Sequence, residues 1–430
     1  VEAAIQYRRA LNAASRLDSV DDDALRAVRT SLADVLEQAG MYDEARDALS
    51  AALRVAGDDA IVRADLMLRR ARTWQQSGSL SNAKRSITLG RKSLDLGGTR
   101  EHRMAAARLD SFDALIAMSE GRPEAALEAA QRAATIAADT HDDEALARSY
   151  ITLDWAYHML GQPDRATHGE RALEILLRMG HLQRASDVMN NEGGYAYYAG
   201  QWDQALAWYR RSRDASQRAG SVVETAAVGL NLGEVLIGQR RFAAADVELQ
   251  ETYLVLRAAD ARAFLVSAEM QMARLDLETG NAPRAIETLE RLFGLLNRAG
   301  NQVASLEVAI HLCDALVREQ RPSEGLKRIA AAGNAAGLEG AFFASAISRV
   351  RSQALWQLGD AGGARSEADR GVQAAVDAGL PYEEALLRDW RIRMAVSEGL
   401  DVEAEDVRRR DGLFAGLGIR SQADEQLAAG

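Results

Sequence analysis

The chain has 430 residues, of which 47% are hydrophobic and 27% are charged, and its formal net charge at pH 7 is −11. A single cysteine excludes a disulfide framework and favours a reducing compartment, so we expect a cytoplasmic protein. The acidic balance argues against nucleic-acid binding and no hydrophobic run is long enough to span a bilayer, so we expect neither nucleic acid nor a membrane among its partners.

The first residues, Val1 to Tyr7, have the pattern of the second helix of a helical hairpin. A tight-turn signature then recurs about every forty residues, with a small residue five positions after each turn residue. The turn residues are Gly40, Gly78, Gly121, Gly161, Gly200, Arg240, Gly280, Gln320, Gly359 and Gly399. A second glycine series is interleaved with the first, and two stop signals per repeat predict two helices per repeat. We therefore expect an all-α solenoid of about nine to ten repeats.

A second position of most repeats, seven residues before the turn, is also small, like the position five residues after it. Two antiparallel helices can pack closely only where neither carries a bulky side chain, so we interpret these as the crossing positions of each hairpin. The first series is Ala33, Ala71, Ala114, Asp154, Gly193, Gly233, Ala273, Cys313 and Ser352, and the second includes Ala45, Ala83, Ala126, Ala166, Ala205, Ala245, Ala285, Gly325 and Ala364.

Three segments between the predicted helices differ in composition. Residues 18–23 and 139–144 are acidic, which suits the start of the following helix through N-capping and the helix dipole. Residues 330–340 form the one interruption rich in glycine and alanine, and we interpret it as a softer joint in a continuous solenoid.

The hairpin signature resembles that of tetratricopeptide repeats, in a long-helix variant, over essentially the whole chain. The resemblance implies a right-handed superhelix of αα-hairpins, and we expect a single domain over residues 1–430. Because the sequence begins inside a repeat, we also expect it to be a fragment of a larger protein.

A narrower resemblance lies in residues 189–212 and 229–238 and in the ending Arg409 to Ile419. These segments are similar to the C-terminal repeat region of bacterial signalling proteins that join a class III nucleotide cyclase to an AAA-type ATPase. The resemblance implies a non-catalytic regulatory module. Similar repeats also follow the ATPase in transcriptional activators of the maltose-regulator type, and an architectural scaffold for oligomerisation is a third alternative.

No catalytic or cofactor motif is present in the sequence. None of the three lysines completes a phosphate-binding loop, and the six histidines and one cysteine lack metal-ligand spacing. Cys313 could act as a nucleophile, but its crossing position favours a buried structural residue. We therefore expect no enzymatic activity, no cofactor and no metal site.

The candidate binding residues follow from the resemblance, which implies that the first helix of each hairpin lines the concave face. In that register the candidates are Arg108, Arg148, Trp155, His158, Asn190, Asn191, Tyr197, Asn231 and Glu234. Asparagine amides can pair in both directions with a peptide backbone, arginines suit a carboxylate or phosphate, and the aromatic residues supply apolar contact. The expected partners are a peptide or protein, upstream domains of the same polypeptide or a small effector, and a homo-oligomer is compatible with such a scaffold.

Each candidate also has a structural interpretation. Asn191 and Asn231 could bond to a neighbouring helix, and the aromatic residues with His158 could belong to the core between repeats. Arg108 and Arg148 could pair with Asp65 or Asp187 on a solvated face.

Overall fold

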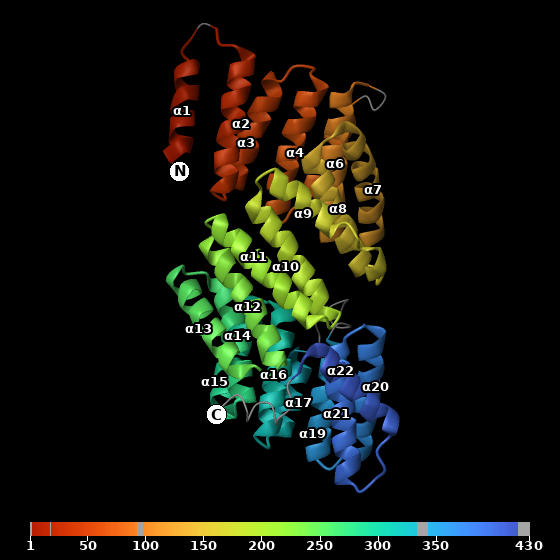
Figure 1. Cartoon of the computed structure of the whole chain (residues 1–430). Coiled ribbons are helices and arrows are strands. Elements are labelled where there is room, and N and C mark those ends of the chain that lie inside the picture. Colours follow the sequence, from red (N-terminus) through yellow and green to blue (C-terminus); the bar gives the residue numbers. More distant parts are fainter. Residues whose placement is uncertain (1, 18, 93, 95–97, 333–342, 420–430) are drawn as a thin grey trace. The chain divides into compact units, whose positions relative to one another are not determined.

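The computed structural model describes residues 2–17, 19–92, 94, 98–332 and 343–419 (Figure 1). All regular elements among these residues are helical, so the prediction of an all-α chain is confirmed. The chain separates into two compact units, Val1–His181 and Leu182–Gly430, which are described one at a time. No described helix has the length and apolar composition needed to cross a membrane.

The first unit contains nine α-helices and one 3₁₀ turn among its described residues. They are α1 (Glu2–Ala14), α2 (Asp22–Gln38), α3 (Tyr42–Val55), α4 (Ala60–Gln76), α5 (Leu80–Lys92), α6 (Arg100–Ser119), α7 (Pro123–Thr140), α8 (Asp143–Met159), η1 (Pro163–Arg165) and α9 (Gly169–Arg178). As predicted for the acidic segments, the side chains of Asp21 and Asp142 cap α2 and α8 by accepting hydrogen bonds from backbone amides.

The second unit continues the same pattern of paired helices. Its described helices are α10 (Leu182–Tyr198), α11 (Trp202–Arg218), α12 (Val222–Gly238), α13 (Phe242–Ala258), α14 (Arg262–Glu278), α15 (Ala282–Ala299), α16 (Gln302–Arg318), α17 (Pro322–Ala332), α19 (Ala344–Gln357), α20 (Ala361–Asp377), α21 (Pro381–Ser397) and α22 (Ala404–Leu417). Most of the predicted soft joint at 330–340 lies outside the described residues.

The predicted turn residues end the first helix of each hairpin in the left-handed conformation. Gly200 has φ of 76°, and Arg240 and Gln320, which replace glycine in this series, have φ of 57° and 59°. The prediction that the crossing positions are buried is confirmed at Ala33, Ala71 and Cys313, which are at most 2% exposed.

Two crossings differ from the expected pairing of small residues. A Cβ on Gly193 would lie 2.5 Å from the ring of Tyr209, and one on Gly233 would lie 2.5 Å from Leu249. These glycines therefore make room for a large side chain of the second helix, so the hairpin interface is filled from one side.

The hairpin after Gly161 departs from the predicted pattern. Its second helix begins only at Gly169, after η1, instead of directly after the turn. The cause is Asp154, which stands where other repeats have a small residue. Its buried carboxylate accepts hydrogen bonds from the backbone N–H of His168 at 2.8 Å and pairs with His168 Nδ1 at 2.7 Å. These two bonds hold the start of α9 at His168.

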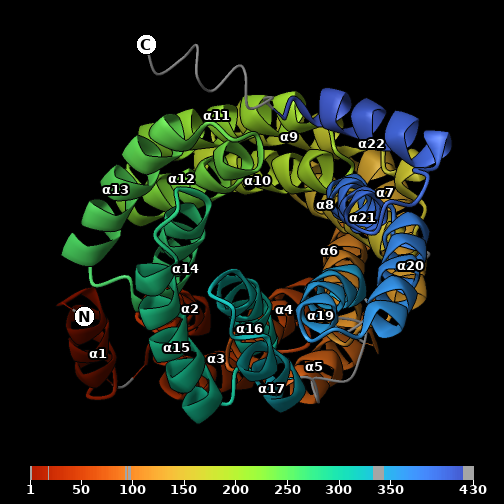
Figure 2. The same cartoon turned by 90° about the horizontal axis from the view of Figure 1, so that it is seen from below.

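The second unit closes on itself, with its helices following one another around a ring (Figure 2). Its last hairpin, α21–α22, packs against its first helices: the rings of Trp202 and Tyr382 are 4.9 Å apart, and Leu417 joins Trp202 in one buried cluster. The Gln239 side chain donates a hydrogen bond to the Leu417 carbonyl at 3.2 Å. The hairpins of this unit therefore form a ring rather than an open groove.

Candidate functional site

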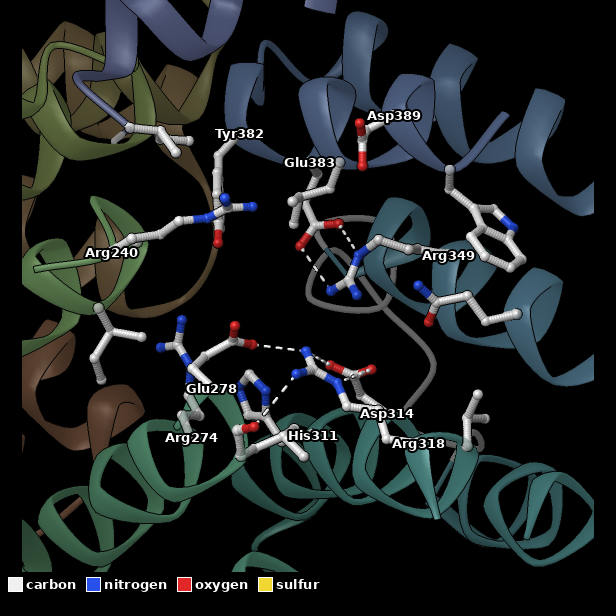
Figure 3. A pocket seen from close by; sticks show the side chains of 18 of the residues that line it. Arg240, Arg274, Glu278, His311, Asp314, Arg318, Arg349, Tyr382, Glu383 and Asp389 are labelled. Carbon is white, nitrogen blue, oxygen red and sulfur yellow. Dashed lines mark hydrogen bonds and ion pairs between the residues drawn. The ribbon is translucent and has the colours of Figure 1, made fainter. Parts of the chain in front are cut away.

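A cavity of about 590 Å³ lies inside the ring of the second unit (Figure 3). Most of its lining comes from the first helices of successive hairpins, α12, α14, α16, α19 and α21, and the rest comes from Arg240 in a turn, Phe242 at the start of α13 and residues at and after the end of α22. This agrees with the expectation that the first helix of each hairpin forms the inner surface. The volume falls within the range of roughly 300–1,000 Å³ that is typical of small-ligand sites.

The cavity wall is strongly charged, and most of these charges are paired with one another. Arg349 makes a bidentate ion pair with Glu383, at 2.8 and 3.2 Å, and the two side chains are only 11% and 18% exposed. Arg318 pairs with Glu278 at 2.7 Å and with Asp314 at 3.2 Å. Such pairs rigidify the wall, and they leave these guanidinium groups partly occupied before any ligand binds.

Arg240 is the exception among the cations of the wall. Its guanidinium points into the cavity (Figure 3) and has no hydrogen-bond or ion-pair partner in the described part of the chain. Its backbone is left-handed, with φ of 57°, at a turn where most repeats have glycine. A side chain costs about 1–2 kcal/mol in this conformation, so an arginine is held there against a local preference.

A second, smaller chamber of about 140 Å³ lies next to this cavity. Five residues line both spaces and therefore form the partition between them: Arg274, His311, Arg349, Tyr382 and Glu383. The partition is tied to the neighbouring helices because Glu234 accepts hydrogen bonds from Arg274 at 3.1 Å and from the Tyr197 hydroxyl at 3.2 Å.

Burial sets the protonation of two groups in these walls. It lowers the pKa of His311 far below the usual value, and the charges of Arg274 and Arg349 lower it further, so the imidazole is neutral at pH 7. Burial raises the pKa of Glu307 in the smaller chamber to about 7, with a further contribution from Glu234. Glu307 therefore titrates near neutral pH.

The predicted candidates of the first unit are held by their own neighbours. Arg108 donates from Nε to Asp142 at 2.7 Å, and Arg148 pairs with Glu144 at 2.9 Å. Asp142 therefore pairs with Arg108 across adjacent repeats, and Glu144 pairs with Arg148 one helical turn away.

Trp155 and His158 lie on α8 in the same unit. Trp155 is half-buried and packs against a cluster that contains Ala117, Met118 and Ala156. Burial lowers the pKa of His158, against the opposing charge of Asp154, so its imidazole is neutral at pH 7. These contacts support the structural interpretation of Trp155, in which it belongs to the core between repeats.

The candidates of the second unit divide into two groups. Tyr197 and Glu234 line the smaller chamber. Asn231 donates from Nδ2 to the side-chain oxygen of Asn190 at 2.8 Å, whereas Asn191 is exposed. The bond of Asn231 to a neighbouring helix fits its structural interpretation, and none of the three asparagines lines either of the two cavities.

Most residues of the cavity wall were not among the predicted candidates. The inner-surface positions had been assigned only in the central repeats, and the wall lies largely in the later ones. Arg274 stands in the same position before Gly280 as Glu234 stands before Arg240, and His311, Arg349 and Arg393 occupy such positions in later repeats. In the sequence, Arg240 could have been recognised because it occupies a turn position at which most repeats have glycine.

Known structures share this architecture at low sequence identity. A signal-transduction ATPase with numerous domains and a tetratricopeptide repeat sensor, from Pyrococcus horikoshii, matches 77% of this chain at 12% identity with a TM-score of 0.55. This match covers 52% of that protein, so the chain spans about half its length.

Two further structures are similar. A Rap protein in complex with the competence and sporulation factor matches 92% of this chain and 99% of its own, at 11% identity and a TM-score of 0.53. The apo form of the quorum sensor NprR from B. thuringiensis matches 76% of this chain and 91% of its own, at 13% identity and a TM-score of 0.56. No protein-family model and no curated protein matches the sequence.

The helix pairs and these neighbours define the chain as a helical repeat protein of the tetratricopeptide type. At such identities the likeness concerns the fold.

Proposed function

We propose that the chain is a non-catalytic regulatory module whose second unit binds a peptide or small effector inside its ring. The observation that carries this proposal is the guanidinium of Arg240, which faces the cavity of about 590 Å³ without a partner among the described residues. The other arginines whose pairs are described above already have carboxylate partners, so the wall has one cation available for a ligand. The expected ligand carries an anionic group, a carboxylate or a phosphate.

The named functions of the structural neighbours support this proposal. One neighbour is called a tetratricopeptide repeat sensor, one is a quorum sensor, and one was solved with a bound signalling factor. The cavity inside the ring is our candidate site for such a signal.

We further propose that the module belongs to a multidomain bacterial signalling protein of the cyclase–ATPase type. The segments 189–212, 229–238 and 409–419 support this through their resemblance, and the Pyrococcus neighbour is an ATPase with such a sensor. The sequence of the parent gene is the test: an upstream cyclase domain supports the proposal, whereas a downstream helix-turn-helix domain would make the chain the effector-sensing part of a transcriptional activator.

Ligand binding is tested with the purified chain and pools of short peptides that have a free or an amidated carboxyl terminus, with inorganic phosphate as a third ligand. Native mass spectrometry and thermal shift report binding. We expect binding that requires an anionic group and that Arg240→Gln weakens at least tenfold, while the exposed Arg257→Gln leaves it unchanged. Binding that ignores both the anionic group and Arg240 would overturn the proposal, and self-association without ligand binding would favour an architectural scaffold.

A further inference from the structure

The smaller chamber contains an acidic side chain without a partner. Glu307, on α16, makes no hydrogen bond or ion pair with another described residue, and the charge of Arg274 offsets only part of the effect of burial and Glu234 on its pKa. Arg274 instead donates to Glu234 at 3.1 Å and to the Gln271 side-chain oxygen at 2.8 Å. The chamber therefore has an excess of carboxylate over cation.

A second polar group in the same wall is also unsatisfied. Ser345, in the first turn of α19, is 1% exposed, and its hydroxyl oxygen is buried without a hydrogen-bond partner. A buried hydroxyl without a partner is unfavourable, and few such groups are found in folded proteins. Glu307 and Ser345 line one small space, so a single bound group can satisfy both.

Aromatic side chains form a large part of the remaining chamber wall. Its lining includes Tyr197, Tyr198, Trp202, Phe343 and Tyr382. Trp202 stacks on Tyr197, with ring centroids 5.6 Å apart, and lies 4.9 Å from Tyr382. Aromatic faces attract organic cations through their quadrupoles, and they repel carboxylates. Both the lone acid and the rings therefore favour a cationic group.

We propose that the smaller chamber binds an organic ammonium group, with Glu307 as its counter-charge and Ser345 as a hydrogen-bond acceptor. This inference rests on the proposed function, since the ammonium group would be the amino terminus or a lysine-type side chain of the same ligand whose anionic group reaches Arg240. The ligand would then be dipolar, and the partition between the two spaces would separate its two charges.

Binding of the ammonium group would be linked to release of a proton. Glu307 has a pKa of about 7 and accepts a cation only in its ionised form. The tyrosines of the wall stay neutral, because burial raises the pKa of Tyr198 and of Tyr382 to about 12. The other titratable and charged groups that line the chamber are Tyr197, Glu234, Arg274, His311, Arg349 and Glu383.

The test uses the complete chain and two molecules of similar shape, n-butylammonium and n-butanol, with binding measured by ligand-observed NMR. We expect the ammonium to bind and the alcohol to bind at least tenfold more weakly. The affinity for the ammonium should fall about tenfold from about pH 8 to about pH 6, as the ionised fraction of Glu307 falls from about nine-tenths to about one-tenth.

Two variants test whether Glu307 causes the preference for the ammonium. Glu307→Gln should abolish the preference for the ammonium and its pH dependence, while Glu319→Gln, an exposed change at the end of the same helix, should leave both intact. Equal binding of the two molecules to the unmodified chain would overturn the inference without any variant, and unchanged ammonium binding in Glu307→Gln would do the same.

The experiment also separates this inference from the proposed function. Arg240→Gln should leave butylammonium binding unchanged while it weakens binding of anionic peptides. If anionic peptides bind through Arg240 but the ammonium does not bind, the inference fails and the proposed function stands. If butylammonium binds through Glu307 while no anionic ligand binds, the proposed function fails and the ammonium subsite stands.

Discussion

The side-chain amide of Gln239 donates a hydrogen bond of 3.2 Å to the backbone carbonyl of Leu417, 178 residues further along the chain. Gln239 is buried, and its partner lies in the last turn of α22. This bond joins the first hairpins of the second unit to the last one, so the unit is a closed ring. Ring closure matters for function because the candidate cavity lies inside it.

The closing contact predicts an unusual sensitivity at Gly200. An alanine there would place its Cβ 2.6 Å from Pro381, in addition to adopting φ of 76°. We expect Gly200→Ala to reduce the free energy of unfolding by about 2–4 kcal/mol, the sum of backbone strain and steric overlap.

Gly220→Ala is the matched control. Gly220 has φ of 77°, but nothing lies within 4 Å of an added Cβ, so we expect only the backbone cost of about 1–2 kcal/mol. Urea unfolding of both variants measures the difference. Equal losses would mean that Pro381 does not press on Gly200 in solution.

Asp154 should be essential for the local structure of the first unit. Asp154→Ala removes the acceptor of two hydrogen bonds from His168 and leaves a partly buried backbone amide without a partner. We expect a loss of about 1–3 kcal/mol and faster amide hydrogen exchange at the start of α9. The exposed Asp164→Ala should change neither quantity, and normal protection of α9 in Asp154→Ala would contradict this explanation of its late start.

The asparagine pair gives a double-mutant cycle. Asn231 and Asn190 share a hydrogen bond of 2.8 Å, so Asn190→Ala and Asn231→Ala should be non-additive, with a coupling of about 0.5–1.5 kcal/mol. Asn191 is exposed, and Asn191→Ala should stay within about 0.5 kcal/mol and add independently to Asn231→Ala. Additive effects of Asn190→Ala and Asn231→Ala would mean that this hydrogen bond does not form in solution.

Glu307 makes the stability of the fold depend on pH. Its pKa is raised from 4.5 to about 7 in the folded chain, so the native state binds more protons than the unfolded state between these values. Stability should therefore fall as the pH rises from about 4.5 to about 7, by at most about 3 kcal/mol from this group, and then level off.

Glu307→Gln should remove this part of the pH dependence, and Glu319→Gln should retain it. Unfolding free energies at several pH values measure both variants. An unchanged pH profile in Glu307→Gln would show that the carboxyl is solvated in solution.

Cys313 and Gly325 form a crossing that tolerates no added volume. A Cβ on Gly325 would lie 2.8 Å from the sulfur of Cys313 and 3.3 Å from its backbone. We expect Gly325→Ala to cost about 1–3 kcal/mol, and Cys313→Ala to recover part of that loss when the two are combined.

The exposed helical Gly412, with nothing within 4 Å of an added Cβ, is the control, and Gly412→Ala should stabilise by up to about 1 kcal/mol. In the native chain, burial raises the pKa of the Cys313 thiol to about 12, so alkylation should be slow. Rapid alkylation of folded chain would contradict the buried placement.

Sequence periodicity was sufficient to predict the helical hairpins. Turn residues such as Gly200 and small residues such as Ala71 make contacts within one repeat or with its neighbour. Because these contacts are local, the spacing of such residues in the sequence is sufficient to predict them. The same periodic register also located Tyr197 and Glu234 on the inner surface, and it would have reached Arg274 and Arg349 if it had been carried into the later repeats.

Only the tertiary structure could decide which inner residues meet and which remain unpaired. The contacts of Gln239 with Leu417 and of Trp202 with Tyr382 join repeats far apart in the chain, so no local spacing records them. Whether a polar residue is paired depends on distances of a few ångströms between neighbouring helices, as the hydrogen bond from Asn231 to Asn190 shows. The chemistry of the site, and above all the lone Glu307 and Arg240, follows from how the hairpins close around the cavity, because burial and pairing are set by all the surrounding helices together.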